Sequence, residues 1–398
     1  MRLVIADKFP DRFLGEFKSL GLEVTYAPES TAERLREIAR EATILVVRST
    51  KVTRETIEQA RSLAVIIRAG AGYDTIDVTA ASERGIFVTN CPGKNSVAVA
   101  ELTMGLLLAL DRRIPDNTAD LRKGQWNKKE YGKADGLKGK SLGLAGLGPI
   151  GRAVAARAQA FEMRVVAWSR SLTPERAEEL GVEPAASLDD LAACDVVSVH
   201  LPMTADTKKR FGEAFFGKMK KGAIFLNTSR GGLVDQAALV RAMNEKGLRA
   251  ALDVFDGEPA EAAGSFASEL FALPGFVGTH HIGASTDQAQ NAIAAEAVRI
   301  CREFVESGQV PNVVNVQQHA KASHQLIVRH RDKVGVLAAV LGIIRNHSVN
   351  VEEMSNTIFA GAKTAVAVMR LSVAPPAGLV DEIAALKDEV IFVEAKGH

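Results

Sequence analysis

The chain has 398 residues, of which 47% are hydrophobic and 24% are charged, and its formal net charge at pH 7 is +1. A chain of this length is expected to form about two to four domains. A net charge so close to zero excludes a global field that would attract nucleic acid or an anionic membrane, so we expect neither as a partner.

The first third of the chain alternates short apolar runs with helical patterns. The apolar runs are residues 3–6, 43–47, 63–67 and 86–88, and the helical patterns cover residues 31–40, 53–60 and 76–84. Apolar strands without polar alternation, separated by helices, indicate a parallel sheet that is covered on both faces. A long helix is then expected over residues 96–110.

After a polar stretch at residues 122–140, the same alternation begins again. Apolar runs occur at residues 141–148, 164–168, 195–201, 223–228, 248–254 and 276–280, and a last long helical pattern covers residues 286–305. Two such series predict two doubly wound parallel-sheet α/β domains with a ligand cleft between them. We expect a discontinuous substrate-binding domain of residues 1–96 and 283–316, and a dinucleotide-binding Rossmann domain of residues 97–282.

The C-terminal segment follows a different order. Strand patterns lie at residues 324–330, 349–359, 364–373 and 390–395, and helical patterns lie between them at 334–346 and 379–387. This βαββαβ order is typical of a small ferredoxin-like domain, here residues 324–398. The polar residues 317–323 form the expected linker.

The cysteines and the apolar windows predict the compartment. Cys91, Cys194 and Cys301 are isolated in the sequence, which indicates a reducing compartment and argues against a disulfide framework or a thiolate metal site. The most apolar window, residues 97–110, is interrupted by Glu101 and is too short for a membrane span. No apolar signal segment opens the chain. We therefore expect a cytoplasmic protein without a metal site.

The sequence GLGPIG, which starts at Gly146, lies between an apolar strand and a helical pattern, as in dinucleotide-binding loops. Gly146 permits a tight turn, Gly148 lets a pyrophosphate approach the backbone, and Gly151 allows close packing of helix on strand. Pro149 and Ile150 open the helix, whose exposed N–H groups attract phosphate. A tight turn alone would explain one glycine but not three at this spacing.

The residues after the next strand bear on the choice between NAD and NADP. An acidic side chain about 20 positions after the glycines would accept the hydroxyls of the adenosine ribose. This chain has Ser169 and Arg170 there and no carboxylate, which suits the 2′-phosphate of NADP. The other interpretation is that Arg170 is a solvated loop residue and that NAD binds, so the cofactor stays open between NAD and NADP.

Four motifs occur together in order: GLGPIG from Gly146, LNTSRGGLVD from Leu226, ALDVFDGEP from Ala251 and THHIGAST from Thr279. Together they resemble the D-isomer-specific 2-hydroxyacid dehydrogenases, and the resemblance covers residues 1–315. It implies an enzyme that transfers a hydride between a nicotinamide cofactor and the C2 carbon of a small D-2-hydroxy acid.

The resemblance implies a catalytic triad of Arg230, Glu258 and His281. The guanidinium would grip the substrate carboxylate and polarise the C2 oxygen. The imidazole would exchange a proton with that oxygen, because the ordinary pKa of histidine lies near working pH. Glu258 would orient the imidazole and stabilise its protonated form. The structural alternatives are a surface salt-bridge arginine, a loop carboxylate and a structural histidine.

One residue departs from the family pattern. The family usually has proline before the catalytic histidine, whereas this chain has His280. Proline there would fix φ and aim the end of the strand. The pattern assigns catalysis to His281 and leaves His280 as its rival.

The resemblance also implies contacts beyond the triad. Along the cofactor it places Asp253, near the nicotinamide amide, and His200, Pro202, Thr228, His281 and Gly283. On the substrate side, the turn of Gly70, Ala71 and Gly72 is expected to offer N–H groups to the substrate carboxylate. Asn95 lies where the chain crosses between the two domains. The other interpretation of Gly70 and Gly72 is a simple turn.

Two arginines bear on the choice of hydroxy acid. Arg48 and Arg68 each follow an apolar run, so both are expected at the carboxyl ends of neighbouring strands on one rim of the first domain. The segments around them are most similar to the family members that act on 3-phosphoglycerate in serine biosynthesis, where matching arginines contact the phosphate. The structural interpretation is that Arg68 serves architecture and that Arg48 pairs with Glu55.

Two other functions stay open. One is a glyoxylate or hydroxypyruvate reductase, which Ser169 and Arg170 would suit if NADPH is preferred. The other is a nicotinamide-sensing scaffold similar to the C-terminal-binding-protein corepressors, although a regulatory C-terminal domain favours a metabolic enzyme. The resemblance also implies a homodimer or homotetramer formed through the cofactor domain.

The C-terminal domain resembles the ACT-type regulatory domain, which implies an amino-acid effector such as L-serine. His330, Asp332 and Asn350 match the effector-binding positions, and we expect His330 and Asn350 on adjacent strands, where one small zwitterion would touch both. The family usually has asparagine where this chain has Asp332, and an ionised aspartate would repel the ligand carboxylate. The alternative is a domain retained for dimerisation.

Overall fold

The apolar runs of the first third form a five-stranded parallel sheet in the order β2-β1-β3-β4-β5. In this computed structural model its elements are β1 (Arg2–Ile5), α1 (Asp11–Ser19), β2 (Glu23–Tyr26), α2 (Ala32–Ile38), β3 (Ile44–Val47), α3 (Arg54–Gln59), β4 (Val65–Arg68), α4 (Val78–Glu83) and β5 (Phe87–Thr89). Strand β2 was not predicted, because it lies at the sheet edge with mostly exposed residues and so lacks a continuous apolar run.

The second series of runs forms a seven-stranded parallel sheet in the order β12-β11-β10-β9-β6-β7-β8. Its strands are β6 (Ser141–Ala145), β7 (Arg164–Trp168), β8 (Glu183–Pro184), β9 (Val196–Val199), β10 (Ile224–Asn227), β11 (Arg249–Leu252) and β12 (Phe276–Gly278). The helices of this region are α5 (Ser96–Asp111), α6 (Ile114–Arg122), α7 (Lys128–Tyr131), α8 (Pro149–Ala160), α9 (Pro174–Glu179), α10 (Glu213–Lys218) and α11 (Gln236–Lys246), with short 3-10 turns η1 (Leu188–Ala193), η2 (Gly231–Leu233) and η3 (Glu269–Ala272).

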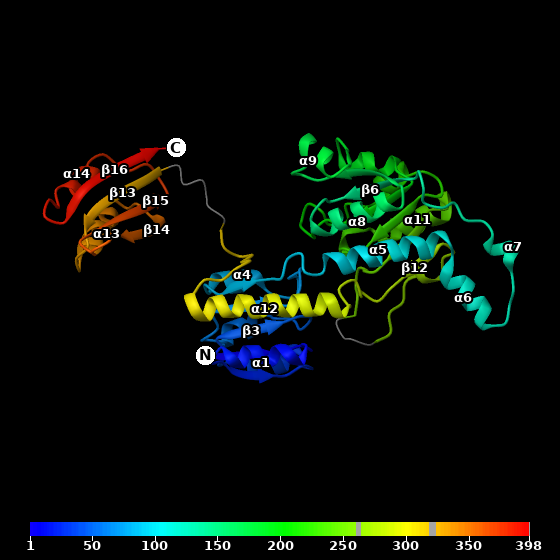
Figure 1. Ribbon diagram of the computed structural model, residues 1–398, viewed down its shortest axis with the longest axis horizontal. Helices are drawn as coiled ribbons and strands as arrows, with labels where there is room; N and C mark the ends of the chain where they lie inside the picture. Colours follow the sequence, from blue (N-terminus) through cyan, green and yellow to red (C-terminus); the bar gives the residue numbers. More distant parts are fainter. Residues whose placement is uncertain (260–263, 318–323, 398) are drawn as a thin grey trace. The chain divides into compact units, whose positions relative to one another are not determined.

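The structure describes residues 1–259, 264–317 and 324–397. The chain forms two compact units, Met1–Asn315 and Val316–His398 (Figure 1). Within the described residues, no helix is both long and apolar enough to cross a membrane. Residues 318–323 of the expected linker lie outside the described part of the chain.

The hydrophobic side chains of the first unit form separate clusters on the two sheets. Side chains of α12 (Asp287–Ser307) pack with those of the first sheet, whereas side chains of α5 pack with those of the second. The division of this unit into residues 1–96 with 283–316, and residues 97–282, stays a prediction. Each sheet changes its winding direction once, between β1 and β3 and between β6 and β9. Ligands bind at the carboxyl ends of strands at such points.

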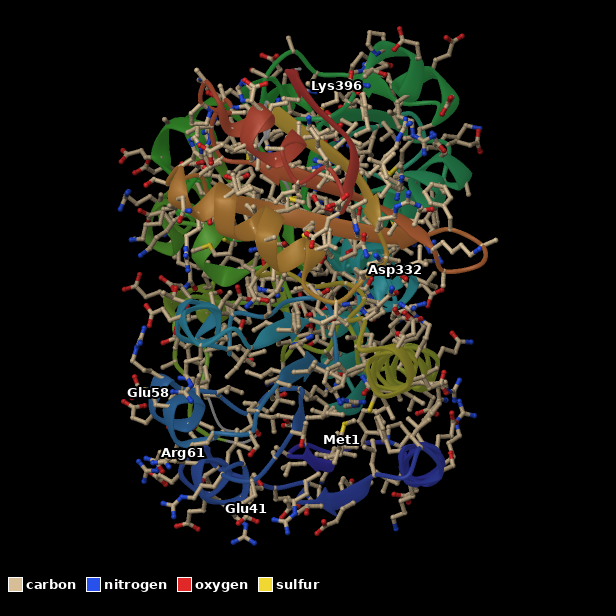
Figure 2. All side chains as sticks on the ribbon, turned by 90° about the vertical axis from the view of Figure 1, so that its left-hand side faces the viewer. Met1, Glu41, Glu58, Arg61, Asp332 and Lys396 are labelled. Carbon is tan, nitrogen blue, oxygen red and sulfur yellow. The ribbon has the colours of Figure 1, made fainter. Side chains whose placement is uncertain are left out.

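The second unit is an antiparallel sheet of order β14-β15-β13-β16, built in the βαββαβ sequence that the patterns predicted. Its elements are β13 (His324–Arg331), α13 (Val336–Asn346), β14 (Val351–Ile358), β15 (Thr364–Leu371), α14 (Leu379–Ala384) and β16 (Val390–Gly397). Its core contains Leu326, Val340 and Met369, all buried. Figure 2 shows Asp332 and Lys396 at opposite ends of this sheet, as the antiparallel pairing of β13 with β16 requires.

The expectation that His330 and Asn350 lie on adjacent strands is wrong. Strand β15 inserts between β13 and β14, because it forms a hairpin with β14 and pairs with β13 along its other edge. His330 is level with Ile358 at the end of β14, whereas Asn350 precedes Val351 at its start. At about 3.3 Å per residue, the two positions are roughly 25 Å apart along the strands. One small ligand therefore does not reach both within one chain.

Candidate active site

A cavity of about 1090 Å³ opens at the carboxyl ends of strands from both sheets of the first unit. It is lined by the segments that follow β3, β4, β10, β11 and β12 and by those that begin α5 and α12. Of the residues that the sequence singled out, its lining includes Arg48, Arg68, Gly70, Ala71, Gly72, Asn95, Ile150, Thr228, Arg230, Asp253, Glu258, His280, His281 and Gly283.

The remaining candidates belong to the second sheet and lie outside the described lining of that cavity. They are the glycine-loop residues Gly146, Gly148, Pro149 and Gly151, the residues after β7, Ser169 and Arg170, and the residues after β9, His200 and Pro202. All follow, or begin a helix after, the carboxyl end of a parallel strand. In the described residues, no group of three or more His, Cys, Asp or Glu side chains is arranged to hold a metal ion.

His281 and Glu258 form a hydrogen-bonded pair in the cavity. The distance from His281 Nδ1 to Glu258 Oε2 is 2.7 Å. The other carboxylate oxygen accepts a hydrogen bond from the Phe255 N–H at 2.6 Å. Burial raises the pKa of Glu258, but the bonds from His281 and Phe255 lower it further, and the net pKa lies below the usual range. Glu258 is therefore an ionised acceptor that fixes the imidazole.

The turn that carries His281 is held by Asp253. The backbone of His281 is in the left-handed region with φ 52°, an uncommon conformation for a residue with a side chain. Its N–H donates to the Asp253 carbonyl at 2.8 Å. The Asp253 carboxylate accepts from Thr279 Oγ1 at 2.6 Å, from Ile282 N at 2.8 Å and from Gly283 N at 2.9 Å. This buried aspartate thus shapes the histidine turn, a task that the sequence did not indicate.

Arg230 follows β10 and is bonded to the turn after β4. Its Nε donates to Asp74 Oδ2 at 2.7 Å, and its Nη1 donates to the Ser229 carbonyl at 2.7 Å. A Cβ added at Gly72 would lie 1.5 Å from Arg230 Nη2. In the same way, a Cβ at Gly70 would lie 1.6 Å from Arg68 Nη1. The two glycines therefore leave room for the two guanidinium groups, which a simple turn would not require.

Arg48 and Arg68 meet in the cavity, as their strand-end positions predicted. Burial, and then the charges of Arg230 and Arg48, lower the pKa of Arg68 to about 10. Its Nε is buried without a hydrogen-bond partner among the described residues, and so is Asn95 Oδ1. Buried polar atoms usually have partners, so these two atoms are suited to bind a ligand.

The turn after β3 is held by an aspartate that the sequence patterns did not reveal. Asp7 follows β1, and its carboxylate accepts hydrogen bonds from Arg48 N at 2.6 Å, Thr50 N at 3.2 Å and Thr50 Oγ1 at 3.1 Å. Asp7, rather than Glu55, is the carboxylate that raises the pKa of Arg48 against the larger lowering by burial. Lys51 lies in the same turn, lines the cavity and was also missed.

The glycine loop has the geometry of a tight strand–helix turn. Gly146 has φ 102°, and a Cβ there would lie 2.6 Å from the His200 carbonyl oxygen. A Cβ at Gly151 would lie 2.1 Å from the Gly146 carbonyl oxygen, so the helix needs glycine to pack on the strand. At Gly148 no protein atom lies within 4 Å of an added Cβ. Packing explains Gly146 and Gly151, whereas the space beside Gly148 is open, and its expected contact with a pyrophosphate stays a prediction.

His200 lies under this loop. Its Nε2 is 2.9 Å from Ser198 Oγ, and its Nδ1 is buried with no partner in the described part of the chain. Burial lowers the pKa of His200 to about 4, so the imidazole is neutral at neutral pH. A protein contact for the cofactor and a structural support for the loop are both compatible with this position.

Acid is expected to destabilise the protein through His200. Its pKa is 6.5 in the unfolded chain and about 4 in the folded chain. Between these values the unfolded chain binds more protons, so the free energy of unfolding falls as the pH falls, by about 2 kcal/mol from pH 7 to pH 5. Urea unfolding at both pH values should show a smaller difference for His200→Asn than for the wild type. Equal differences would contradict this role of His200.

The chain is similar to known proteins over the region that contains the glycine loop and the His281–Glu258 pair. Residues 104–283 match the family described as "D-isomer specific 2-hydroxyacid dehydrogenase, NAD binding domain". The D-3-phosphoglycerate dehydrogenase of Methanocaldococcus jannaschii is 41% identical over 319 residues, which cover 79% of this chain and 60% of that protein. The enzyme of the same name from Mycobacterium tuberculosis H37Rv is 38% identical over 402 residues, covering 99% of this chain and 72% of that protein. The chain belongs to the D-isomer-specific 2-hydroxyacid dehydrogenase family.

Other members of the D-isomer-specific 2-hydroxyacid dehydrogenase family differ in their named substrates. The glyoxylate reductase of Thermococcus litoralis is 40% identical over 290 residues, 71% of this chain and 85% of that protein. The solved structure of an NAD+-bound 3-phosphoglycerate dehydrogenase from Entamoeba histolytica has a TM-score of 0.67 at 27% identity, covering 79% of this chain and 99% of the other. The solved structure of an NADPH-dependent glyoxylate/hydroxypyruvate reductase from Sinorhizobium meliloti has a TM-score of 0.69 at 28% identity, covering 79% of this chain and 96% of the other.

Membership of the D-isomer-specific 2-hydroxyacid dehydrogenase family gives residues 104–283 the fold of an NAD-binding domain. The chain spans about three fifths of the length of the M. jannaschii relative, so the activity of the whole protein is a separate question.

An aromatic wall beside the histidine turn is a feature of the site that the sequence patterns did not predict. It consists of Phe255, Phe266, Phe271 and Phe276, whose ring centroids are 5.4 to 6.3 Å apart in the contacting pairs.

Proposed function

We propose that the protein is a nicotinamide-dependent dehydrogenase that interconverts 3-phosphoglycerate and 3-phosphohydroxypyruvate in the cytoplasm, the first step of serine biosynthesis. The observation that carries this proposal is that Arg48, Lys51 and Arg68 line the cavity that also holds the His281–Glu258 pair. A substrate with both a carboxylate and a phosphate uses several cations, because guanidinium groups bind both anions in a bidentate manner. The names of the M. jannaschii and M. tuberculosis relatives support the same substrate.

The dinucleotide is proposed to bind at the glycine loop, with its pyrophosphate at Gly148 and at the first turn of α8, whose N–H groups attract anions. A nicotinamide cofactor held there would supply the hydride donor or acceptor for C2 of the substrate. Thr228, Asp253 and Gly283 line the part of the cavity assigned to that ring; His200 lies beside the loop, and Pro202 follows His200 in the segment after β9. Ser169 and Arg170 follow β7 without a carboxylate, so the proposal includes both NAD and NADP.

His281 is proposed to exchange the proton of the C2 oxygen through Nε2. Its Nδ1 is bonded to the ionised Glu258, which favours a proton on Nδ1 and leaves Nε2 as the exchanging atom. In alcohol oxidation Nε2 accepts the hydroxyl proton, and in the reverse reaction it donates that proton to the developing alkoxide. Glu258 stabilises the protonated imidazole, because opposite charges attract at this distance.

Arg230 is proposed to bind the substrate carboxylate and to polarise the C2 oxygen. Its Nη2 hydrogens and the second hydrogen of Nη1 have no hydrogen-bond partner among the described residues. The N–H groups of the Gly70–Gly72 turn and the amide of Asn95 lie in the same cavity and are assigned to the substrate. Charge that develops on the C2 oxygen then meets fixed donors, which stabilise the transition state.

A second candidate function is a glyoxylate or hydroxypyruvate reductase. It is favoured by the T. litoralis relative and by the absence of a carboxylate beside Ser169 and Arg170. A nicotinamide-sensing scaffold is the third candidate, and it predicts cofactor binding without turnover. Turnover measured with phosphohydroxypyruvate, hydroxypyruvate and glyoxylate, each with NADH and NADPH, separates the three. The proposal expects the highest kcat/KM with phosphohydroxypyruvate.

Removing Arg68 is expected to impair the phosphorylated substrate selectively. One charge-assisted hydrogen bond contributes about 1.5–3 kcal/mol, so Arg68→Ala should lower kcat/KM for phosphohydroxypyruvate by roughly 10–100-fold and change that for hydroxypyruvate far less. Arg48→Ala should act in the same direction. The exposed Arg61, labelled on the surface in Figure 2, supplies a control variant, Arg61→Ala, with unchanged kinetics. Equal losses on both substrates would mean that Arg48 and Arg68 are architectural.

The second unit is proposed to bind an amino-acid effector only across two copies of the chain. His330 is 2% exposed, and its ring nitrogens lie 2.8 Å from the Arg331 carbonyl oxygen and 3.1 Å from Asn356 Oδ1. Because His330 and Asn350 lie far apart within one chain, an effector would use His330 from one copy and Asn350 from another, with Asp332 disfavouring a carboxylate. This arrangement requires a homodimer or homotetramer, which we propose as the working assembly.

L-Serine is the first effector to test. Calorimetry on the full chain at millimolar L-serine, with glycine as a comparison, should give binding that His330→Ala abolishes. Activity should change with L-serine in the same concentration range, since an effector must bind two conformational states unequally. Absence of binding for all amino acids tried would leave the second unit with a role in assembly alone.

A further inference from the structure

Asp74 joins the turn after β4 in the first sheet to an arginine of the second sheet. Its Oδ2 accepts the hydrogen bond from Arg230 Nε at 2.7 Å. Arg230 Nη1 is bonded in turn to the Ser229 carbonyl at 2.7 Å. Two of the three guanidinium nitrogens thus have oxygen partners from the protein, which fixes the plane of the group in the cavity.

Gly72 also contributes to the position of the Arg230 guanidinium, because it leaves space for Nη2. A Cβ at position 72 would lie 1.5 Å from Arg230 Nη2 and 3.1 Å from Asp74 Oδ2. The turn therefore presents a carboxylate to one edge of the guanidinium and a bare backbone to the next. The turn follows the first sheet and the arginine follows the second. Their contact therefore depends on how the two sheets are placed across the cavity.

The charge of Asp74 acts on two arginines. Burial and then repulsion by Arg230 and Arg48 lower the pKa of Arg68, whereas the charge of the Asp74 carboxylate raises it. The Asp74 side chain is 55% exposed, so solvent screens part of this attraction. Even so, the carboxylate is a counter-ion for the arginine assigned to the C2 oxygen and for one assigned to the substrate phosphate.

We propose that Asp74 is a positioning residue for Arg230. Its carboxylate holds the guanidinium in the orientation that the substrate meets, and its charge lets Arg230 and Arg68 occupy one cavity. This inference rests on the proposed function, because that function gives Arg230 its role with the substrate. A residue that acts on the orientation of Arg230 affects the transition state, in which charge builds up on the C2 oxygen, more than it affects binding of the cofactor.

The test compares three variants on the full chain: Asp74→Ala, Asp74→Asn and the control Asp77→Ala. Asp74→Ala should lower kcat by about tenfold to a hundredfold, the effect of one hydrogen bond to a charged group, with KM for NAD(P)H and the melting temperature unchanged. Asp74→Asn keeps an acceptor for Nε and should fall between the wild type and Asp74→Ala. Asp77 caps α4 through a bond from Ala80 N, so its removal should lower the melting temperature and leave kcat unchanged.

A double-mutant cycle with Arg230→Lys separates positioning from an independent effect. If Asp74 works through Arg230, adding Asp74→Ala to Arg230→Lys should lower kcat by less than about twofold, whereas in the wild type it costs about tenfold or more, on the order expected for coupled groups. Independent, multiplicative losses would overturn the inference, and so would a wild-type kcat in Asp74→Ala. If the wild type itself turns over none of the three 2-oxo acids, the proposed function fails first, and this outcome is distinct from active enzyme with an indifferent Asp74.

Discussion

Replacing His281 by asparagine is expected to lower kcat by about 10²–10⁴-fold, the usual contribution of a general acid or base. The physical reason is that asparagine occupies a similar volume but has no ring nitrogen that could exchange a proton with the C2 oxygen. The bond from His281 Nδ1 to Glu258 and the location of both groups in the cavity support this assignment. Steady-state kinetics with a 2-oxo acid and NADH or NADPH measure the effect.

His280 supplies the matched control, since it is the neighbouring imidazole and lines the same cavity. His280→Ala should change kcat far less, because the carboxylate of Glu258 is bonded to His281. A severe loss in His280→Ala together with a mild loss in His281→Asn would exchange the two assignments. Similar melting temperatures for the two variants would exclude misfolding as the cause of either loss.

Gly72→Ala is expected to fold normally and to lose about a hundredfold in kcat/KM. The added Cβ would lie 1.5 Å from Arg230 Nη2, so the guanidinium has to move. The atom that moves is the end of a flexible side chain, and for this reason the free energy of unfolding should change little. A displacement of about 1 Å in a group that binds the substrate costs on the order of 10²-fold in rate.

The control for this variant is Gly217→Ala in α10. No atom lies within 4 Å of a Cβ added at Gly217, so alanine there should keep full activity and stabilise the helix slightly. Thermal unfolding and kcat/KM measured side by side on both variants decide the matter. Wild-type kcat/KM in Gly72→Ala would mean that the position of Arg230 is not set by this turn.

The sheets and most site positions could be predicted because they depend on local patterns. Unbroken apolar runs give buried parallel strands, and side chains that directly follow such strands meet at one edge of the sheet. This rule predicts that Arg48 and Arg68 lie together, and both line one cavity. The glycine pattern likewise predicted a tight turn at Gly146 and close packing at Gly151, and both are present.

What could not be predicted depends on contacts between distant segments. Asp7 bonds to the turn of Arg48, which lies 41 positions away in the sequence, and Asp74 bonds to Arg230 across 156 positions. No periodicity records such pairs. The prediction that His330 and Asn350 lie on adjacent strands of the second unit was wrong for a related reason. Adjacent strands in sequence are not adjacent in space when a later strand, here β15, inserts between them. His330 and Asn350 are therefore not neighbours within one chain.

Because Asp253 holds the His281 turn, the binding energy of the substrate is not needed to order that turn. The His281 side chain is 51% exposed, yet its turn is tied to one buried carboxylate and one carbonyl of the same residue. Such a turn is preorganised: it already has its working backbone conformation before the substrate arrives. Ordering a loop costs free energy that is subtracted from binding. Here that cost was met during folding, so the interactions of the substrate with the arginines remain available to lower the barrier of the reaction.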